Sequence, residues 1–175
     1  MSITTKKITY CALFIAIAVV LSVAFRSLSA AIFPVPFLRF SLAPAIIILA
    51  GAVLGYGYGA VVGAITDVLT FLIIPTGGAF LPMFTLTMAL YGVLGALFFY
   101  KKATPVWKIV LVTILIQTIL SAFLNTMWNI YLYGPMDVVK LTSRLLTSYI
   151  GCAVFIAILI PLLKMKDKVF KQVMA

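Results

Sequence analysis

Long apolar runs, separated by short polar or turn-forming stretches, dominate the chain. A helix that crosses a bilayer needs about 20 mostly apolar residues. Six runs reach or approach that length, at residues 8–25, 40–55, 58–74, 80–100, 107–128 and 138–163. The second and third are short, and only the stretch GYGYG lies between them. The pattern predicts an all-α membrane protein, a compact bundle of six transmembrane helices in which residues 1–175 form a single domain.

The composition identifies lipid as the surrounding solvent. Of the 175 residues, 65% are hydrophobic and only 9% are charged, which is more apolar surface than a soluble domain of this length can bury. Lys6 and Lys7 precede the first run as they would in a signal peptide. That run is too long, however, and no small-residue cleavage site followed by a soluble domain comes after it. We therefore expect a retained first helix.

The net charge of +10 is unevenly distributed along the chain. Six passes place three lysine clusters on one side of the membrane, and loops rich in basic residues face the cytoplasm. Both termini are then cytoplasmic. Nine of the 13 basic residues lie on that side, namely Lys6, Lys7, Lys101, Lys102, Lys108, Lys164, Lys166, Lys168 and Lys171. This distribution favours the lipid bilayer, and not nucleic acid, as the partner of the positive charge.

The other four basic residues map to the outer side. Arg26 and Arg39 bound a predicted outer loop with two prolines, and Lys140 and Arg144 lie near the outer end of the last run. Every arginine of the chain is in this group, and the planar guanidinium group fits a carboxylate. Two interpretations stay open: these side chains extend to lipid headgroups, or they form an anion site.

Small residues recur at a spacing of four in the first half of the chain. Ala12 and Ala16 share one face of the first predicted helix, where they would let another helix approach closely. The second and third runs continue the spacing with Gly51, Gly55, Gly59 and Gly63. These faces serve either packing inside the bundle or docking on another membrane subunit.

A polar stripe follows the fifth run. Gln117, Ser121, Asn125 and then Trp128 or Asn129 recur at helical spacing and therefore share a face. Polar side chains at membrane depth face the bundle interior or a water-filled cavity. Because the stripe becomes more polar and aromatic toward its outer end, it predicts the wall of a pocket that opens outward. The alternative is hydrogen bonding between helices that only stabilises the bundle.

Other runs offer polar groups that could face this stripe. The last run carries Lys140, Arg144, Ser148 and Gly151 at the same spacing, and the outer half of the fourth carries Thr85, Thr87, Met88 and Tyr91. Asp67 is the only acidic residue inside a predicted span. A carboxylate at that depth needs a partner, so Asp67 either pairs with an outer arginine or accepts hydrogen bonds from a ligand.

The residue patterns of catalysis and metal binding are missing from the sequence. It has no histidine, no phosphate-binding glycine loop and no G-x-S-x-G, and Cys11 and Cys152 lie inside apolar runs. Asp67 is remote from Asp137 and Asp167, which lie at other helix ends. We expect no enzyme, no bound cofactor and no metal. Because broken-helix repeats are also missing, a binding bundle that needs a partner to move its cargo fits best.

Several motifs together resemble a known family. The six short helices, Ala12-x-x-x-Ala16 and the cytoplasmic lysine clusters resemble the substrate-binding (S) components of energy-coupling factor (ECF) vitamin transporters. The stretches GGAFLPMFTLTMALYGVLGALFFY (77–100) and LNTMWNIYLYG (124–134) resemble the folate-specific S components, as does LRFSLAP (38–44). Met83 departs from that pattern, since a glycine is expected there. The resemblance covers nearly the whole chain.

The resemblance implies a multi-pass protein of the bacterial plasma membrane that captures folate or a folate derivative from outside. It also implies a transmembrane coupling subunit, which would contact Ala12 and Ala16, and two cytoplasmic ATPase subunits. The protein would topple in the bilayer to release the vitamin inside. Two alternatives stay open: an S component for another flat vitamin, thiamine or riboflavin, and a structural membrane subunit that binds no ligand.

Folate as the ligand would assign roles to the candidate residues. Its flat rings suit aromatic side chains, the edge of its pterin ring needs donors and acceptors, and its glutamate tail needs cations. The expected stacking surfaces are Phe33, Phe37, Trp128 and Tyr131. The expected polar contacts are Asp67, Thr85, Thr87, Asn125 and Asn129, and the expected tail contacts are Arg26, Arg39, Lys140 and Arg144.

Overall fold

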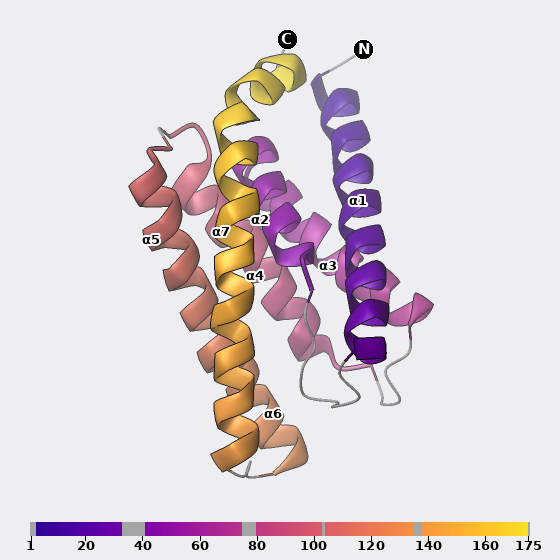
Figure 1. Cartoon of the computed structure of the whole chain (residues 1–175). Helices are drawn as coiled ribbons and strands as arrows, with labels where there is room; N and C mark the ends of the chain where they lie inside the picture. The colour runs from indigo at the N-terminus through magenta and orange to yellow at the C-terminus, as the bar shows by residue number, and fades with distance from the viewer. Residues whose placement is uncertain (1–2, 33–40, 75–79, 103, 135–137, 175) are drawn as a thin grey trace.

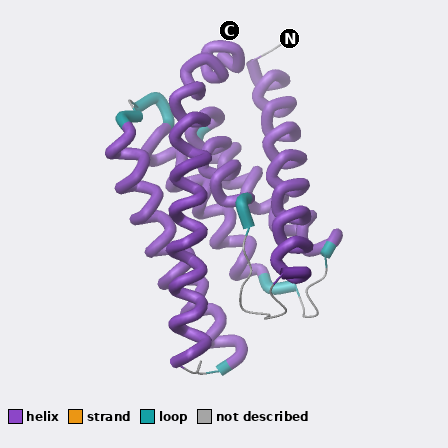
Figure 2. Tube along the Cα trace, viewed as in Figure 1, coloured by secondary structure: helices purple, strands orange, loops and turns teal. Residues whose placement is uncertain are grey.

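A computed structural model of the chain describes residues 3–32, 41–74, 80–102, 104–134 and 138–174. Within these ranges every regular element is helical (Figures 1 and 2). The elements are α1 (Ile3–Ile32), α2 (Ala43–Leu54), α3 (Tyr56–Ile73), α4 (Pro82–Phe99), α5 (Val106–Gln117), the π-helical segment η1 (Thr118–Leu124), α6 (Asn125–Tyr133) and α7 (Val138–Met174). The predicted all-α bundle is confirmed. The start of α1 and the end of α7 lie at the same end of it.

Five helical stretches are long and apolar enough to cross a membrane, by length and composition: Thr5–Ser27, Tyr56–Ile73, Pro82–Phe99, Val106–Tyr131 and Ser148–Met165. The helix α2 differs from them. Its 12 residues span roughly 18 Å, well short of a hydrocarbon core about 30 Å thick. All of its residues are buried, because α1, α3, α4 and α7 pack around it. A helix that is apolar on every side is stable in such a position, so α2 forms the centre of the bundle.

The first helix is longer than predicted. We expected it to end at Phe25 and Arg26 to begin an outer loop, but α1 continues to Ile32. The stretch RSLSAAI contains no glycine or proline, and the first proline after it is Pro34, so nothing in the sequence breaks the helix earlier. Arg26 therefore lies on a helix and not in a loop.

Glycine brings α2, α3 and α4 into backbone contact. A Cβ atom added to Gly51 would collide with the carbonyl oxygen of Gly92, and one added to Gly92 would collide with the carbonyl oxygen of Gly59. Gly63 lies in the same way against the carbonyl oxygen of Met88. Helices approach this closely only where side chains are missing. Of the two interpretations of these glycines, packing inside the bundle is the one that the structure confirms.

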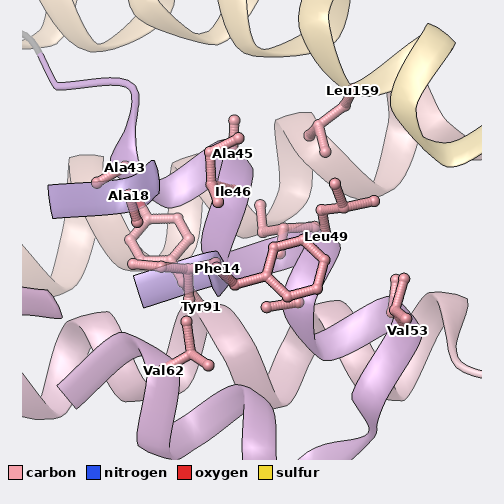
Figure 3. Packing of buried hydrophobic residues seen from close by; sticks show 14 of the residues in the cluster. Phe14, Ala18, Ala43, Ala45, Ile46, Leu49, Val53, Val62, Tyr91 and Leu159 are labelled. Atoms are coloured by element: carbon pink, nitrogen blue, oxygen red, sulfur yellow. The ribbon is translucent and has the colours of Figure 1, made fainter. Parts of the chain in front are cut away.

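The hydrophobic core gathers around α2 (Figure 3). Side chains from α1, α3, α4 and α7 contact α2, so one core includes both the N-terminal and the C-terminal helices. The cluster includes Phe14 from α1, Ile46 and Leu49 from α2, Val62 from α3, Tyr91 from α4 and Leu159 from α7. This centre is apolar and closely packed.

Candidate functional site

A chain of hydrogen bonds joins three helices along the predicted stripe. The Tyr91 hydroxyl of α4 donates to Gln117 Oε1 at 3.0 Å. Gln117 Nε2 donates to Ser148 of α7, at 3.3 Å to its Oγ and 3.4 Å to its carbonyl oxygen. The Ser148 hydroxyl in turn donates to Ser121 Oγ at 2.9 Å. The inner part of the stripe thus faces the polar face of the last helix, as predicted, and its groups are paired.

A π-helical segment lies where the stripe passes from this network to the outer end. In η1 the helix widens, and the backbone N–H of Asn125 donates to the carbonyl oxygen of Leu120, five residues back. Segments of this kind are rare and frequently occur at functional sites. The segment reads TILSAFL and has no glycine or proline, so nothing in the residues predicted it. The helices α5, η1 and α6 form one uninterrupted rod that ends at Gly134, where φ is +82°.

The inward face of α6 holds polar atoms that have no hydrogen-bond partner among the described residues. They are Asn125 Oδ1, Thr126 Oγ1 and Trp128 Nε1, and all three atoms are buried. Thr126 as a whole is only 8% exposed. Asn129 lies on the same face, and its Nδ2 donates to the Asn125 carbonyl oxygen at 2.7 Å. Buried polar atoms are nearly always paired, so an unpaired group needs a ligand, water or ion to explain it.

Tyr131 is much more exposed than Trp128, and its contact with a ligand stays a prediction. It is 76% exposed. At about 100° per residue, Tyr131 lies about 240° around α6 from Asn125, on the side of Met127, which is also exposed. Trp128 and Tyr131 are three residues apart and therefore only about 60° apart around the helix, so they differ more in burial than in direction, Trp128 being half-buried.

A second polar pair lies on α3 and α4. The Thr85 hydroxyl donates to Asp67 Oδ2 at 2.7 Å, and the pair is partly buried. The described partner of the carboxylate is thus a hydroxyl group, and within the described ranges no arginine pairs with it. Thr87 is buried and donates to the carbonyl oxygen of Met83 at 3.0 Å, so its hydroxyl is already paired within α4.

These groups lie at one end of the bundle. Figure 1 places the end of α3, the start of α4 and α6 at the end opposite the chain termini, and α4 packs against both η1 and α6. Asp67 and Asn125 offer acceptor oxygens, and Trp128 offers a donor. Such fixed, partly buried groups suit the recognition of a planar polar molecule, because they need little rearrangement to bind it.

The predicted basic and aromatic contacts are placed only in part. Arg26 is partly exposed, one turn before the last turn of α1. Phe33, Phe37 and Arg39 lie outside the described residues. Lys140 and Arg144 belong to α7, but their side chains are likewise outside the described part of the chain. Contact of these six residues with a ligand stays a prediction.

The helix α1 turns an apolar face outward from the bundle. Ala12 and Ala16 are both exposed, and so are Leu13 and Val20. The small residues of α1 therefore differ from Gly51, Gly59, Gly63 and Gly92, which are buried by backbone contact between α2, α3 and α4. A second helix could approach α1 closely at this point.

Comparisons with known proteins agree with this arrangement. A family model described as "ECF transporter, substrate-specific component" matches residues 6–165. The folate transporter FolT of Clostridium novyi (strain NT) is 30% identical over 120 residues, which make up 69% of this chain and 69% of that protein. A crystal structure of FolT bound with folic acid matches with a TM-score of 0.78 at 27% identity, and the match covers 95% of this chain and 97% of that one.

Proposed function

The chain belongs to the family of substrate-specific components of ECF transporters, and we propose that it binds folate at the end of the bundle opposite its termini. The family assignment made from the sequence is thereby confirmed, and the family is one of transporter components and not of enzymes. Both relatives named above are FolT proteins, and one was solved with folic acid bound. Their similarity makes folate the first candidate ligand, ahead of thiamine and riboflavin.

The observation that carries the proposal is the unpaired polar face of α6. Asn125 Oδ1 and Trp128 Nε1 are buried without a partner in the described structure, and the pterin ring of folate has an edge of alternating donors and acceptors. Asp67, held by Thr85, adds an acceptor from the neighbouring helices. A ligand that pairs these atoms removes a cost of about 1–3 kcal/mol for each buried group.

The rest of folate would extend toward the outer ends of the helices. The aminobenzoyl ring suits Phe33 and Phe37 as stacking surfaces, and the two tail carboxylates suit Arg26, Arg39, Lys140 and Arg144. A charge-assisted bond at a wet entrance is screened by water and salt. We therefore assign most of the affinity to the ring system and less to the tail.

The orientation follows from the lysine clusters. Lys6 and Lys7 lie in the first turns of α1, and Lys101 and Lys102 follow α4, all at the end of the bundle that holds the termini. By the positive-inside rule this end is cytoplasmic, in a six-span topology in which α2 makes the second pass. Cysteine labelling in intact cells tests this: Ser29→Cys should react from outside and Lys102→Cys should not. The opposite pattern would reverse the topology.

Release of folate inside would depend on other subunits. We propose that the exposed Ala12 and Ala16 of α1 contact a transmembrane coupling subunit, with which two cytoplasmic ATPase subunits assemble. Small residues on an exposed helix face permit the close helix approach that such a contact needs. The sequence carries no ATP-binding motif, so energy must come from these partners.

Titration calorimetry on the detergent-solubilised protein tests folate binding. We expect saturable, stoichiometric binding of folate and none of thiamine, and Asn125→Ala and Trp128→Ala should each weaken binding by roughly tenfold or more. Met127→Ala is the matched control, because Met127 is 53% exposed on the opposite face of α6. This variant should bind folate with the affinity of the parent protein. Mass spectrometry of the small molecule released on denaturation identifies the bound form. A parent protein that binds no folate would overturn the proposal.

A further inference from the structure

Thr126 has a buried hydroxyl group that the helix does not use. Threonine in a helix commonly donates to the carbonyl oxygen four residues back, and here Thr70 donates to Thr66 at 2.7 Å and Thr142 to Val138 at 2.7 Å. Thr126 Oγ1 makes no such bond, although the residue is 92% buried, and no other described group pairs with it. Its hydroxyl is therefore available to a molecule that is not part of the fold.

Burial places the Thr126 hydroxyl on the same inward side of α6 as the other unpaired atoms. At about 100° per residue, Thr126 lies about 100° from Asn125 and about 160° from Trp128, so Thr126 and Trp128 are at the two edges of that inward side, with Asn125 between them and the exposed Met127 opposite. The three inward atoms differ in chemistry: Asn125 Oδ1 accepts, Trp128 Nε1 donates and the Thr126 hydroxyl can do either. The inward side of this turn of α6 thus offers both hydrogen-bond donors and acceptors. Such a set suits the edge of a heterocycle on which ring nitrogens, N–H groups and a carbonyl alternate.

We propose that the Thr126 hydroxyl contacts the ligand and forms a hydrogen bond with the nitrogen-containing ring that Asn125 and Trp128 also bind. This inference rests on the proposed function and adds to it a residue that sequence patterns did not mark. A threonine hydroxyl rotates freely about its C–O bond, so it donates to a bare ring nitrogen or accepts from a ring N–H. The partner is a planar nitrogen heterocycle.

Two other threonines provide a comparison within the same fold. Thr66 Oγ1 and Thr113 Oγ1 are also buried and unpaired in the described structure, so an unpaired hydroxyl alone does not define a site. Thr113 lies on α5, 13 residues before Thr126 along one rod, which is roughly 20 Å at 1.5 Å per residue. It faces no other unpaired atom of α6. Thr113→Val therefore removes the same chemical group in a place where no ligand is expected.

Calorimetry with folate tests the inference on four proteins: the parent, Thr126→Val, Thr126→Ser and Thr113→Val. Valine keeps the shape of threonine, so Thr126→Val should bind roughly tenfold more weakly, the loss expected when a ligand group is buried without its partner. Thr126→Ser keeps the hydroxyl and should bind within about threefold of the parent. Thr113→Val should bind as the parent does. Without ligand, the melting temperature of Thr126→Val should not fall, because no bond within the protein is lost.

Three outcomes would overturn the inference, and one would overturn more. If Thr126→Val binds folate as tightly as the parent, the hydroxyl does not contact the ligand. If Thr126→Ser loses as much affinity as Thr126→Val, keeping the hydroxyl does not keep binding, and the effect comes from side-chain packing and not from a hydrogen bond to the ligand. If Thr113→Val weakens binding equally, the effect is not local. If the parent itself binds no folate, the proposed function fails and this inference fails with it.

Discussion

The hydrogen bond between Tyr91 and Gln117 allows a quantitative test of what holds the outer helices to the bundle. Both side chains are buried, at 2% and 5% exposure, and the hydroxyl donates to Oε1 at 3.0 Å. Tyr91→Phe and Gln117→Met each remove one partner and keep most of the volume. The double variant removes both partners, so the four proteins form a double-mutant cycle.

The expected size of the coupling follows from the setting. Leaving a buried polar group unpaired costs about 1–3 kcal/mol. Coupling energies of hydrogen bonds between helices, measured by double-mutant cycles in a membrane bundle, average about 0.6 kcal/mol and reach about 1.7 kcal/mol. They are this small because polar groups of the unfolded chain find other hydrogen-bond partners in the membrane. Gln117 also holds Ser148, so Gln117→Met loses contacts on both sides. We expect each single variant to lose about 1–2 kcal/mol and the coupling energy to be about 1 kcal/mol.

Unfolding in mixed micelles, followed by tryptophan fluorescence, measures these energies. Thr118 and Tyr149 provide the control, because they also join the α5–η1–α6 rod to a neighbouring helix, here α7, but on the exposed side and with an O···O distance of 3.5 Å. A contact that long is weak, so Thr118→Val with Tyr149→Phe should give a coupling below about 0.3 kcal/mol. A Tyr91–Gln117 coupling equal to this control would refute the view that the buried network stabilises the bundle.

Three further predictions test the packing, the partner surface and the site. Gly92→Ala should lose about 3 kcal/mol or more of stability, because its Cβ would collide with the Gly59 carbonyl; Gly57→Ala, which meets nothing, should accumulate like the parent on fluorescence-detected gel filtration. Ala16→Trp should abolish folate uptake in cells that also contain the coupling subunits, while calorimetric affinity for folate stays within about twofold; lost affinity would place Ala16 in the binding site. Asp67→Ala should weaken folate binding about tenfold, and Thr85→Val about threefold because the carboxylate loses the 2.7 Å bond that orients it; parent-like binding by both would exclude the pair from the site.

Periodicity and composition could predict most of the fold. Long apolar runs correspond to helices because lipid leaves backbone groups no other partner, and each predicted run contains a described helix. Helix ends were harder to predict. The length of an apolar run does not indicate that the stretch RSLSAAI continues the first helix through Arg26. The role of α2 could not be predicted either. Its run looked like a short span, and its burial depends on the glycine contacts with α3 and α4 together with the packing of α1 and α7 around it.

The sequence could predict which side chains of the candidate site face the bundle, but not which hydrogen-bond partners they have. Helical spacing grouped Gln117, Ser121 and Asn125 correctly, since these side chains do face the bundle. It could not predict that Tyr131 is far more exposed than Trp128, because near a polar helix end both residue types suit either lipid headgroups or a ligand. Thr126 was missed because a threonine one residue off the stripe carries no signal by itself. Its relevance depends on the missing hydrogen bond, which only coordinates reveal.

One rod, α5–η1–α6, thus carries two kinds of polar surface with opposite energetic consequences. Before the π segment, Gln117 is fully engaged with Tyr91 and Ser148, and such pairing stabilises the empty protein. Beyond it, Asn125 and Trp128 keep buried atoms unpaired, and this destabilises the empty protein by an amount that a ligand can restore. Binding at a concentration 100 times Kd adds about 2.7 kcal/mol of stability. The paired half therefore stabilises the bundle without any ligand, and, on the proposed function, the unpaired half selects the molecule that pairs its buried atoms.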